Sequence, residues 1–316
     1  MKLMQLGESD LKVTRVALGC MRLSDVPEEA MSSVQAALDA GMNFFDHADI
    51  YGGGGKEKVF SHLWEQHPHL RHKILLQSKC GIRFPGTPHQ NSPGRYDFSY
   101  GHILQSVEGS LQRLKTDYLD VLLLHRPDPL IEPEEVANAF SRLRQEGKVR
   151  YFGVSNHTAA QMQFLQSYLD MPLIANQVQL SVTHNQLFND GVVFNQDDLG
   201  VQSRAEGTVE YCRTHNITLQ AWSPLEGGYL SGRLIDFDHP VYKETAKVVA
   251  EIAEEHEISP TAVIVAWILR HPAKIQVIVG TTDPQRIADS AQADEVDLTR
   301  EEWYRLFEAG RGGRMP

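Results

Sequence analysis

Four residues that handle protons lie in the first part of the chain, each next to an apolar run. Asp46 and Tyr51 stand five positions apart in the segment DHADIYGGGG, Lys79 ends the run ILLQSK, and His125 follows VLLL. Exposure to solvent explains a lysine or a histidine in such a place poorly, because a polar or charged group that leaves water needs a partner. These four side chains can be partners for one another if the fold brings them together.

The set of Asp46, Tyr51, Lys79 and His125 suits the delivery of a proton to a carbonyl oxygen. A free tyrosine has a pKa of about 10, and an ammonium such as Lys79 beside it would stabilise the phenolate and lower that pKa. Asp46 would keep Lys79 protonated and oriented, and His125 would hydrogen-bond the substrate oxygen or assist Tyr51. Because no nucleophilic Cys or Ser motif is present, transfer of a hydride from a nicotinamide is the simplest reaction to expect at the carbonyl carbon.

Short apolar runs alternate with longer amphipathic segments along the chain. The runs predicted as buried strands are Thr14–Leu18, Asn43–Asp46, Ile74–Gln77, Leu119–Leu124, Arg150–Val154, Ile174–Val178, Thr218–Trp222 and Gln276–Val279. The segments predicted as helices are one that begins at Pro27 and stops before Gly41, then Tyr100–Lys115, Glu134–Gln145, Ala159–Tyr168, Arg204–His215, Tyr242–His256, Pro260–His271 and Pro284–Ala291.

Eight strands that alternate with helices predict a parallel α/β sheet with helical crossovers. An open doubly wound sheet would carry GxGxxG in its first strand-to-helix turn, but that turn reads GCMRLSDVP. The count of eight units without a linker favours one (β/α)8 barrel, of the TIM type, as a single domain over residues 1–316. The pieces MKLMQL and LKVTRV, joined by GESD, predict a β-hairpin before the first barrel strand. Asp46, Lys79 and His125 would then meet at one rim.

The composition narrows the class of protein further. Acidic residues outnumber basic ones by 41 to 30, a net charge of −11, which argues against a nucleic-acid partner. The three cysteines lie far apart with no metal-binding spacing, as in a reducing cytosol. Charges interrupt the N-terminal apolar runs, and no run approaches the ~18 apolar residues of a membrane helix. We expect a soluble, cytoplasmic protein with no membrane partner; no feature indicates its oligomeric state.

Motifs in a fixed order give the chain a resemblance to a known family. DHADIYGG, QSKCG, LDVLLLHRPD, GKVRYFGVSN, NQVQ, AWSPL and IVGTT resemble the aldo-keto reductases over essentially the full chain, and among them bacterial reductases with the DHADIYGG form. The order and spacing of the motifs carry this resemblance more than any single motif does. It implies a barrel that reduces aldehydes or ketones with NADPH, and it makes Tyr51 the general acid and base of a tetrad with Asp46, Lys79 and His125.

The resemblance also implies a cofactor site without a Rossmann fold. It assigns Gly19 and Met21 to the cofactor floor; Ser155, Asn156 and Gln177 to the carboxamide; Trp222 to stacking on the nicotinamide; Ser223, Pro224, Leu225 and Gly227 to the pyrophosphate; and Gly280, Thr281, Thr282 and Arg286 to the adenosine 2′-phosphate. Many members have Lys-Ser where this chain has Gly280-Thr281, so Arg286 remains as the bidentate phosphate partner. We therefore expect NADPH, with NADH as the less favoured cofactor.

Several alternatives remain beside this interpretation. The same fold could serve as a cofactor-binding sensor or regulatory subunit, and His47 and Asp49 beside the tetrad could suggest a metal-dependent barrel hydrolase. The other strand ends supply no acid or imidazole ligands, so a structural hydrogen-bonding role is expected for His47 and no metal site is predicted. Arg126 and Asp128 could pair on the surface. The small-molecule carbonyl substrate would be selected by loops 81–99 and 183–200 and by the tail after Leu298.

Overall fold

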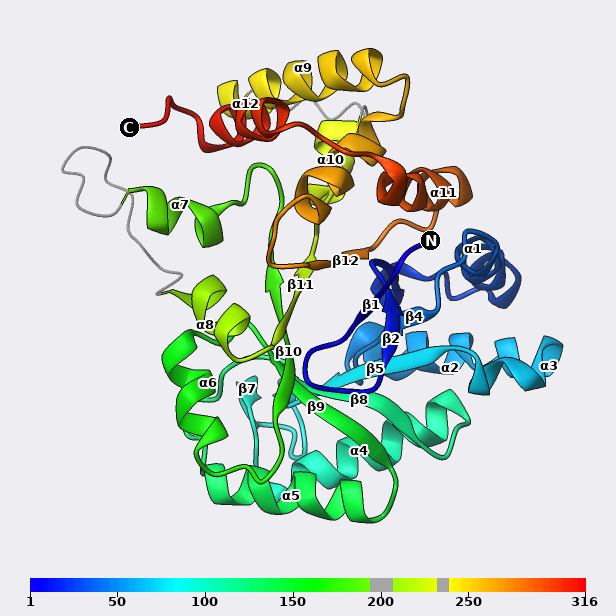
Figure 1. Cartoon of the computed structure of the whole chain (residues 1–316). Helices are drawn as coiled ribbons and strands as arrows, with labels where there is room; N and C mark the ends of the chain where they lie inside the picture. Colours follow the sequence, from blue (N-terminus) through cyan, green and yellow to red (C-terminus); the bar gives the residue numbers. More distant parts are fainter. Residues whose placement is uncertain (194–206, 232–238) are drawn as a thin grey trace.

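A closed barrel of eight strands lies at the centre of the computed structural model, which describes residues 1–193, 207–231 and 239–316 (Figure 1). Its strands are β3 (Val16–Gly19), β4 (Phe44–Asp46), β5 (Leu75–Cys80), β8 (Leu119–Leu124), β9 (Val149–Ser155), β10 (Leu173–Gln179), β11 (Thr218–Trp222) and β12 (Gln276–Val279). Each strand pairs in parallel with the next, and β12 pairs with β3 to close the ring. The predicted (β/α)8 barrel is confirmed.

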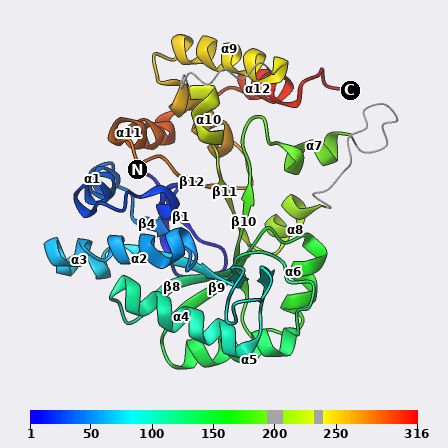
Figure 2. The ribbon, with the colours of Figure 1, turned by 180° about the vertical axis from the view of Figure 1, so that it is seen from behind.

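Helices surround the barrel on all sides in both views (Figures 1 and 2). They are α1 (Pro27–Asp39), α2 (Gly55–Phe60), α3 (Leu63–Gln66), α4 (Tyr100–Leu114), α5 (Pro133–Gln145), α6 (Ala159–Gln166), α7 (Gln186–Val192), α8 (Thr208–Thr214), α9 (Pro240–Glu255), α10 (Pro260–Leu269), α11 (Pro284–Gln292) and α12 (Arg300–Arg311). The helix predicted over Arg204–His215 corresponds to α8, and its first three residues lie outside the described part. None of the described helices is long and apolar enough to cross a membrane.

The predicted N-terminal hairpin forms and closes the amino-terminal end of the barrel. Its strands β1 (Leu3–Gln5) and β2 (Lys12–Thr14) pair antiparallel. Leu6, Leu11 and Val13 are buried in one apolar cluster with residues of the barrel strands, among them Phe44 of β4 and Val121 of β8. Because this cluster fills one end of the lumen with apolar side chains, polar chemistry inside the barrel is confined to the other end.

Three segments differ from the expected loops. Residues 81–99 contain a short hairpin of β6 (Ile82–Arg83) and β7 (Arg95–Tyr96), which Arg83 ties to Asp97 at 2.5 Å. Part of the loop expected at 183–200 is helix α7, and residues 194–200 lie outside the described part. The expected tail after Leu298 is instead largely helix α12, which packs against α9 on the outside of the molecule.

Candidate active site

The four proton-handling residues meet at the carboxyl-terminal end of the barrel. Lys79 of β5 donates hydrogen bonds to both carboxylate oxygens of Asp46 at 2.7 Å and to the phenol oxygen of Tyr51 at 3.1 Å. Its ammonium also reaches the carbonyl of His47 at 2.9 Å. The ring of His125, directly after β8, lies edge-on to the Tyr51 ring with centroids 5.8 Å apart. The structure therefore brings together all four residues that the sequence analysis singled out.

The glycines after Tyr51 set the path of the chain away from the site. Gly52, Gly53 and Gly54 have φ angles of 57°, 63° and 91°, a left-handed conformation that other residues rarely adopt. A Cβ atom on Gly54 would also lie 2.7 Å from the Arg113 side chain. The run of glycines lets the chain turn sharply from Tyr51 into α2, so the phenol stays at the barrel mouth.

Burial and charge act against each other at the tetrad. Burial alone would lower the pKa of Lys79, but Asp46 and Tyr51 outweigh it and raise that pKa, so Lys79 is an ammonium. Burial raises the pKa of Tyr51 by more than the charge of Lys79 lowers it, and Asp46 adds to the rise. The expected lowering of the Tyr51 pKa is therefore wrong for the chain alone, because the burial of the phenol outweighs the effect of the ammonium.

His125 is a neutral imidazole throughout the ordinary pH range. Burial, with smaller contributions from the charges of Lys79 and Arg126, lowers its pKa to about 2. Its Nδ1 atom has no hydrogen-bond partner among the described residues, while the ring lines the cavity described below. A neutral imidazole can donate one hydrogen bond to a substrate oxygen without placing a second cation beside Lys79.

Glutamines inside the barrel support Asp46 from below. Gln77 donates to the Asp46 Oδ1 atom at 2.6 Å, and Gln177 donates to the same atom at 3.1 Å. Both also donate to the Oε1 atom of Gln220. The side-chain N–H of Gln220 in turn donates to Oε1 of Gln276 at 2.8 Å. The sequence analysis missed Gln77, Gln220 and Gln276, although a glutamine inside an otherwise apolar strand was the available signal.

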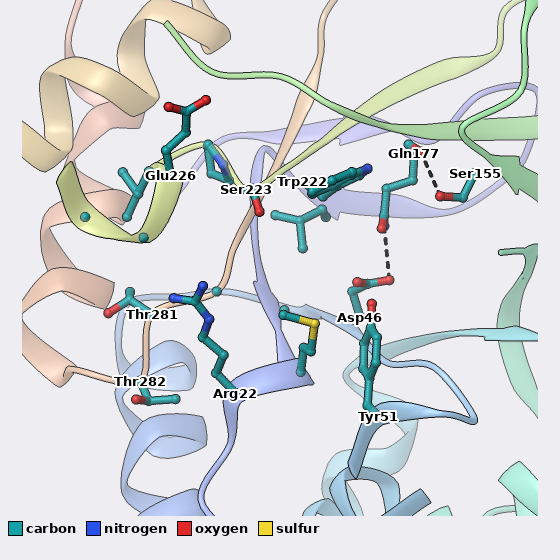
Figure 3. A pocket seen from close by; sticks show the side chains of 18 of the residues that line it. Arg22, Asp46, Tyr51, Ser155, Gln177, Trp222, Ser223, Glu226, Thr281 and Thr282 are labelled. Carbon is teal, nitrogen blue, oxygen red and sulfur yellow. Dashed lines mark hydrogen bonds between the residues drawn. The ribbon is translucent and has the colours of Figure 1, made fainter. Parts of the chain in front are cut away.

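A cavity of about 800 Å³ opens above these residues, and every predicted cofactor residue lines it (Figure 3). Its lining includes Gly19, Met21, Ser155, Asn156, Gln177, Trp222, Ser223, Pro224, Leu225, Gly227, Gly280, Thr281, Thr282 and Arg286. Asp46, Tyr51 and His125 line the same cavity, whereas Lys79 is buried behind Asp46. Residue sets from distant parts of the sequence thus share one cavity of the size typical for cofactor sites.

Hydrogen bonds within the chain fix two walls of this cavity. The indole of Trp222 donates to Asn156 Oδ1 at 3.1 Å, and the Asn156 amide donates to Ser155 Oγ at 2.8 Å. On another wall, Glu226 accepts hydrogen bonds from the Ser181, Thr183 and Tyr242 hydroxyls. This carboxylate joins the segment after β11 to the loop after β10 and to α9, so the wall is held by three parts of the fold.

The comparison with known proteins fits this geometry. The model of the Aldo/keto reductase family matches residues 15–311, nearly the whole chain. The chain belongs to this family. Because members are nicotinamide-dependent oxidoreductases that act on carbonyl compounds and the corresponding alcohols, the protein is an NAD(P)H-dependent oxidoreductase of this type.

Two curated relatives resemble the chain in sequence, and one solved structure resembles it in fold. The chain is 38% identical to Oxidoreductase YdhF of Escherichia coli over 96% of its own length and 95% of the relative. It is 36% identical to the 6-dehydroglucose reductase of Agrobacterium fabrum, covering 94% of each. The glycerol dehydrogenase AKR11B4 from Gluconobacter oxydans has the same fold, with a TM-score of 0.81 and 23% identity, over 98% of this chain and 94% of that one.

Three arginines of this aldo/keto reductase line the cavity without an acidic partner. Arg22, Arg126 and Arg286 make no side-chain hydrogen bond or ion pair within the described residues. The alternative in which Arg126 pairs with Asp128 is wrong, because Asp128 accepts instead from the backbone N–H groups of Phe98 and Leu130 at 3.0 and 2.9 Å. Sequence reasoning missed Arg22, and its place four positions after the end of the first predicted strand was the available signal.

His47 and Asp49 beside the tetrad also lack some of their partners. Both ring nitrogens of the buried His47 are without hydrogen bonds in the described part, and the ring packs edge-on to Phe60 at 4.6 Å. The expected hydrogen-bonding role of His47 is therefore wrong; burial lowers its pKa to about 3 and keeps it neutral. Among the described residues, no group of three or more His, Cys, Asp or Glu is arranged to hold a metal.

Proposed function

We propose that the chain reduces aldehydes or ketones to alcohols with NADPH, and that Tyr51 donates the proton to the carbonyl oxygen. The observation that carries this proposal is the sharing of the Lys79 ammonium between the Asp46 carboxylate and the Tyr51 phenol at the floor of one cavity. A phenol beside a buried ammonium can release a proton because the resulting negative oxygen has a cation 3.1 Å away.

The four residues of the tetrad, which we call the floor of the cavity, then have distinct roles. A bound nicotinamide would supply the hydride that goes to the carbonyl carbon. Tyr51 and the neutral His125 both face the cavity, so they would hold the carbonyl oxygen between two hydrogen-bond donors. Lys79 stabilises the charge that forms on the Tyr51 oxygen, and Asp46 holds Lys79 in place through two bonds of 2.7 Å. Trp222 and Leu225, which line the cavity, would limit the access of water once cofactor and substrate are bound.

The residues of the cavity fit a nicotinamide dinucleotide in chemistry. Trp222 offers an aromatic surface near Tyr51, and Ser155, Asn156 and Gln177 supply amide and hydroxyl groups beside it. Arg22 lies on the side of Thr281 and Thr282, away from Tyr51 and Asp46 (Figure 3). Arg22 and Arg286 would balance the negative charges of the phosphates, and a planar guanidinium such as Arg286 suits the 2′-phosphate of NADPH.

The proposal is tested by following the absorbance of NADPH with a panel of aldehydes and ketones. The panel includes polyhydroxylated aldehydes, because the 36% identical relative is a 6-dehydroglucose reductase. The Tyr51→Phe variant should lose roughly 10²- to 10⁴-fold in kcat, the usual contribution of a positioned proton donor. Tyr168→Phe, at an exposed tyrosine of the surface, is the matched control. Wild-type turnover by Tyr51→Phe would disprove the role of Tyr51.

The sensing role considered from the sequence is not proposed, since no observation in the described residues favours it over turnover.

A further inference from the structure

One arginine of the cavity lining lies directly beside the catalytic residues. Ile50 precedes Tyr51 in the sequence and Arg126 follows His125, and both line the cavity. Trp222 lines it as well and lies under the Arg126 guanidinium. Charges on the floor are already balanced, since Lys79 neutralises Asp46 at 2.7 Å and burial keeps His125 neutral. Arg126 is therefore an unbalanced charge directly beside the proposed proton donors.

The fold holds Arg126 in place without neutralising it. Its backbone is fixed between His125, whose N–H donates to the Cys80 carbonyl at 2.9 Å, and Pro127. Its guanidinium lies over the Trp222 ring, 5.6 Å from the centroid. The side chain is half-buried, and within the described residues it has neither a hydrogen bond nor an ion pair.

Three other arginines that are buried or half-buried each have a carboxylate partner. Arg71 pairs with Asp120 at 3.1 Å, Arg83 with Asp97 at 2.5 Å, and Arg113 with Glu57 at 2.8 Å. A guanidinium that loses water without gaining an acceptor is costly, so a protein usually supplies a carboxylate. The acid closest to Arg126 in sequence, Asp128, is bonded to backbone N–H groups instead. The acceptor for Arg126 is thus absent from the chain's own neighbouring residues.

We infer that Arg126 is a specificity-determining residue that binds the carboxylate of an aldehyde or ketone substrate. This inference rests on the proposed function, because the carbonyl of the same molecule would lie at Tyr51 and His125. A planar guanidinium beside an aromatic wall suits a carboxylate through two parallel hydrogen bonds. The protein as a whole has a net charge of −11 and repels anions, so attraction of an anionic substrate requires a local cation of this kind. Arg22 and Arg286 remain for the cofactor phosphates.

The test compares two substrates of similar shape, 4-carboxybenzaldehyde and 4-methylbenzaldehyde, with NADPH. The wild-type protein should have a kcat/KM for the carboxylate substrate that is about tenfold or more higher than for the methyl substrate, the usual size of a hydrogen bond to a charged group. Arg126→Met should abolish this ratio while leaving kcat/KM for 4-methylbenzaldehyde within about threefold. Arg126→Lys should keep part of the ratio, because it retains charge but loses the planar fork. Arg144→Met, at an exposed arginine of α5, should leave the ratio unchanged.

A binding measurement separates this inference from the proposed function. Calorimetric titration with 4-methylbenzoate should show binding to the cofactor-loaded wild-type protein and about tenfold weaker binding to Arg126→Met. If neither aldehyde is reduced but this difference in Kd is found, the proposed reaction fails and the anion site stands. An equal substrate ratio and an equal Kd for 4-methylbenzoate in the wild-type and Arg126→Met proteins would overturn the inference.

Discussion

The charges at the floor of the cavity and those on its walls are arranged in opposite ways. At the floor, Lys79 and Asp46 bind each other at 2.7 Å, and two glutamines donate to the same carboxylate. On the walls, Arg22, Arg126 and Arg286 have no acidic partner in the described part of the chain. The floor therefore fixes its own charge state before any ligand arrives, whereas the walls are completed by charges that a ligand would bring.

This difference has a consequence for mutations at the two places. A change at the floor leaves a buried group of the protein without its partner, so it should affect both folding and turnover. A change on the wall removes a contact to a ligand, so it should affect binding and leave the fold intact. The following variants test this contrast, beginning with the largest expected effect.

Lys79→Met removes the ammonium that neutralises Asp46 at the floor of the cavity. The variant leaves the Asp46 carboxylate buried without its cation, which typically costs about 3–5 kcal/mol of stability. It also removes the charge beside the Tyr51 oxygen, so kcat should fall by at least about 10²-fold. Urea unfolding gives the first value and NADPH oxidation the second.

Lys115→Met is the matched control, because Lys115 pairs with Glu65 at 3.1 Å on the surface. An exposed pair of this kind contributes at most about 1 kcal/mol. Equal losses of stability in the two lysine variants would show that the pair of Lys79 and Asp46 has no special weight in the fold.

Gln77→Leu weakens the floor without removing a charge. Asp46 Oδ1 would lose its 2.6 Å hydrogen bond, and Gln220 would lose one of two donors. We expect a loss of about 1–3 kcal/mol in stability and a fall in kcat with a smaller change in KM, since Gln77 acts through Asp46. Gln276→Leu removes buried hydrogen bonds that do not touch Asp46, so a similar fall of kcat in both variants would contradict a positioning role for Gln77.

The cofactor end of the wall should respond through binding alone. Arg286→Gln should raise KM for NADPH about tenfold, equivalent to ~1.4 kcal/mol, with little effect on KM for NADH or on stability. Asp283 also lines the cavity, and it accepts a hydrogen bond from the Arg286 backbone N–H at 3.0 Å. Its negative charge beside Arg286 would repel the 2′-phosphate of NADPH. Asp283→Asn, which keeps a helix-capping side chain, should therefore raise the preference for NADPH over NADH. An unchanged ratio in both variants would place the 2′-phosphate elsewhere.

The floor was predictable from the sequence to a greater extent than the walls. Asp46 and His125 end or follow apolar strands, and parallel pairing alone brings such ends to one rim. The glutamines under Asp46 could not be paired, because their contacts depend on strand register and on which side chains face the lumen. Arg126 has no ion pair because Asp128 accepts from backbone N–H groups instead, and no local sequence pattern predicts that choice of partner.

The missed helix α12 is a different case, because its signal was present. Thr299 and Glu302 form a capping box, in which the threonine oxygen accepts from the Glu302 N–H at 3.2 Å and the glutamate accepts from the Thr299 N–H at 2.7 Å. The segment is mostly polar, since only one face packs against the rest of the molecule. Its apolar residues Trp303, Leu306 and Phe307 recur at helical spacing, and the capping box marks where the helix begins.

Asp49 should give the smallest effect, and it marks the edge of the well-partnered floor. Its Oδ1 atom is buried and has no hydrogen-bond partner in the described part, although its backbone N–H donates to the Lys79 carbonyl at 3.0 Å. Burial, together with the neighbouring Glu57 carboxylate, raises the pKa of Asp49 to about 7. The folded chain then retains a proton that the unfolded chain releases above its ordinary pKa of about 4.

This shift predicts a stability that declines as the pH rises from about 4 to about 7 and then levels off, because above 7 both states are ionised. Asp49→Asn cannot ionise, so it should match the wild-type protein near pH 4 and be more stable at pH 8 by on the order of 1 kcal/mol after allowance for solvent screening. Asp170→Asn, at an exposed position, should leave the whole profile unchanged. Urea unfolding at several pH values measures the effect. If Asp49→Asn destabilises the protein equally at pH 4 and pH 8, the hydrogen bonds of Asp49 stabilise the fold more than its burial destabilises it. Asp49 would then belong to the well-partnered residues at the floor of the cavity.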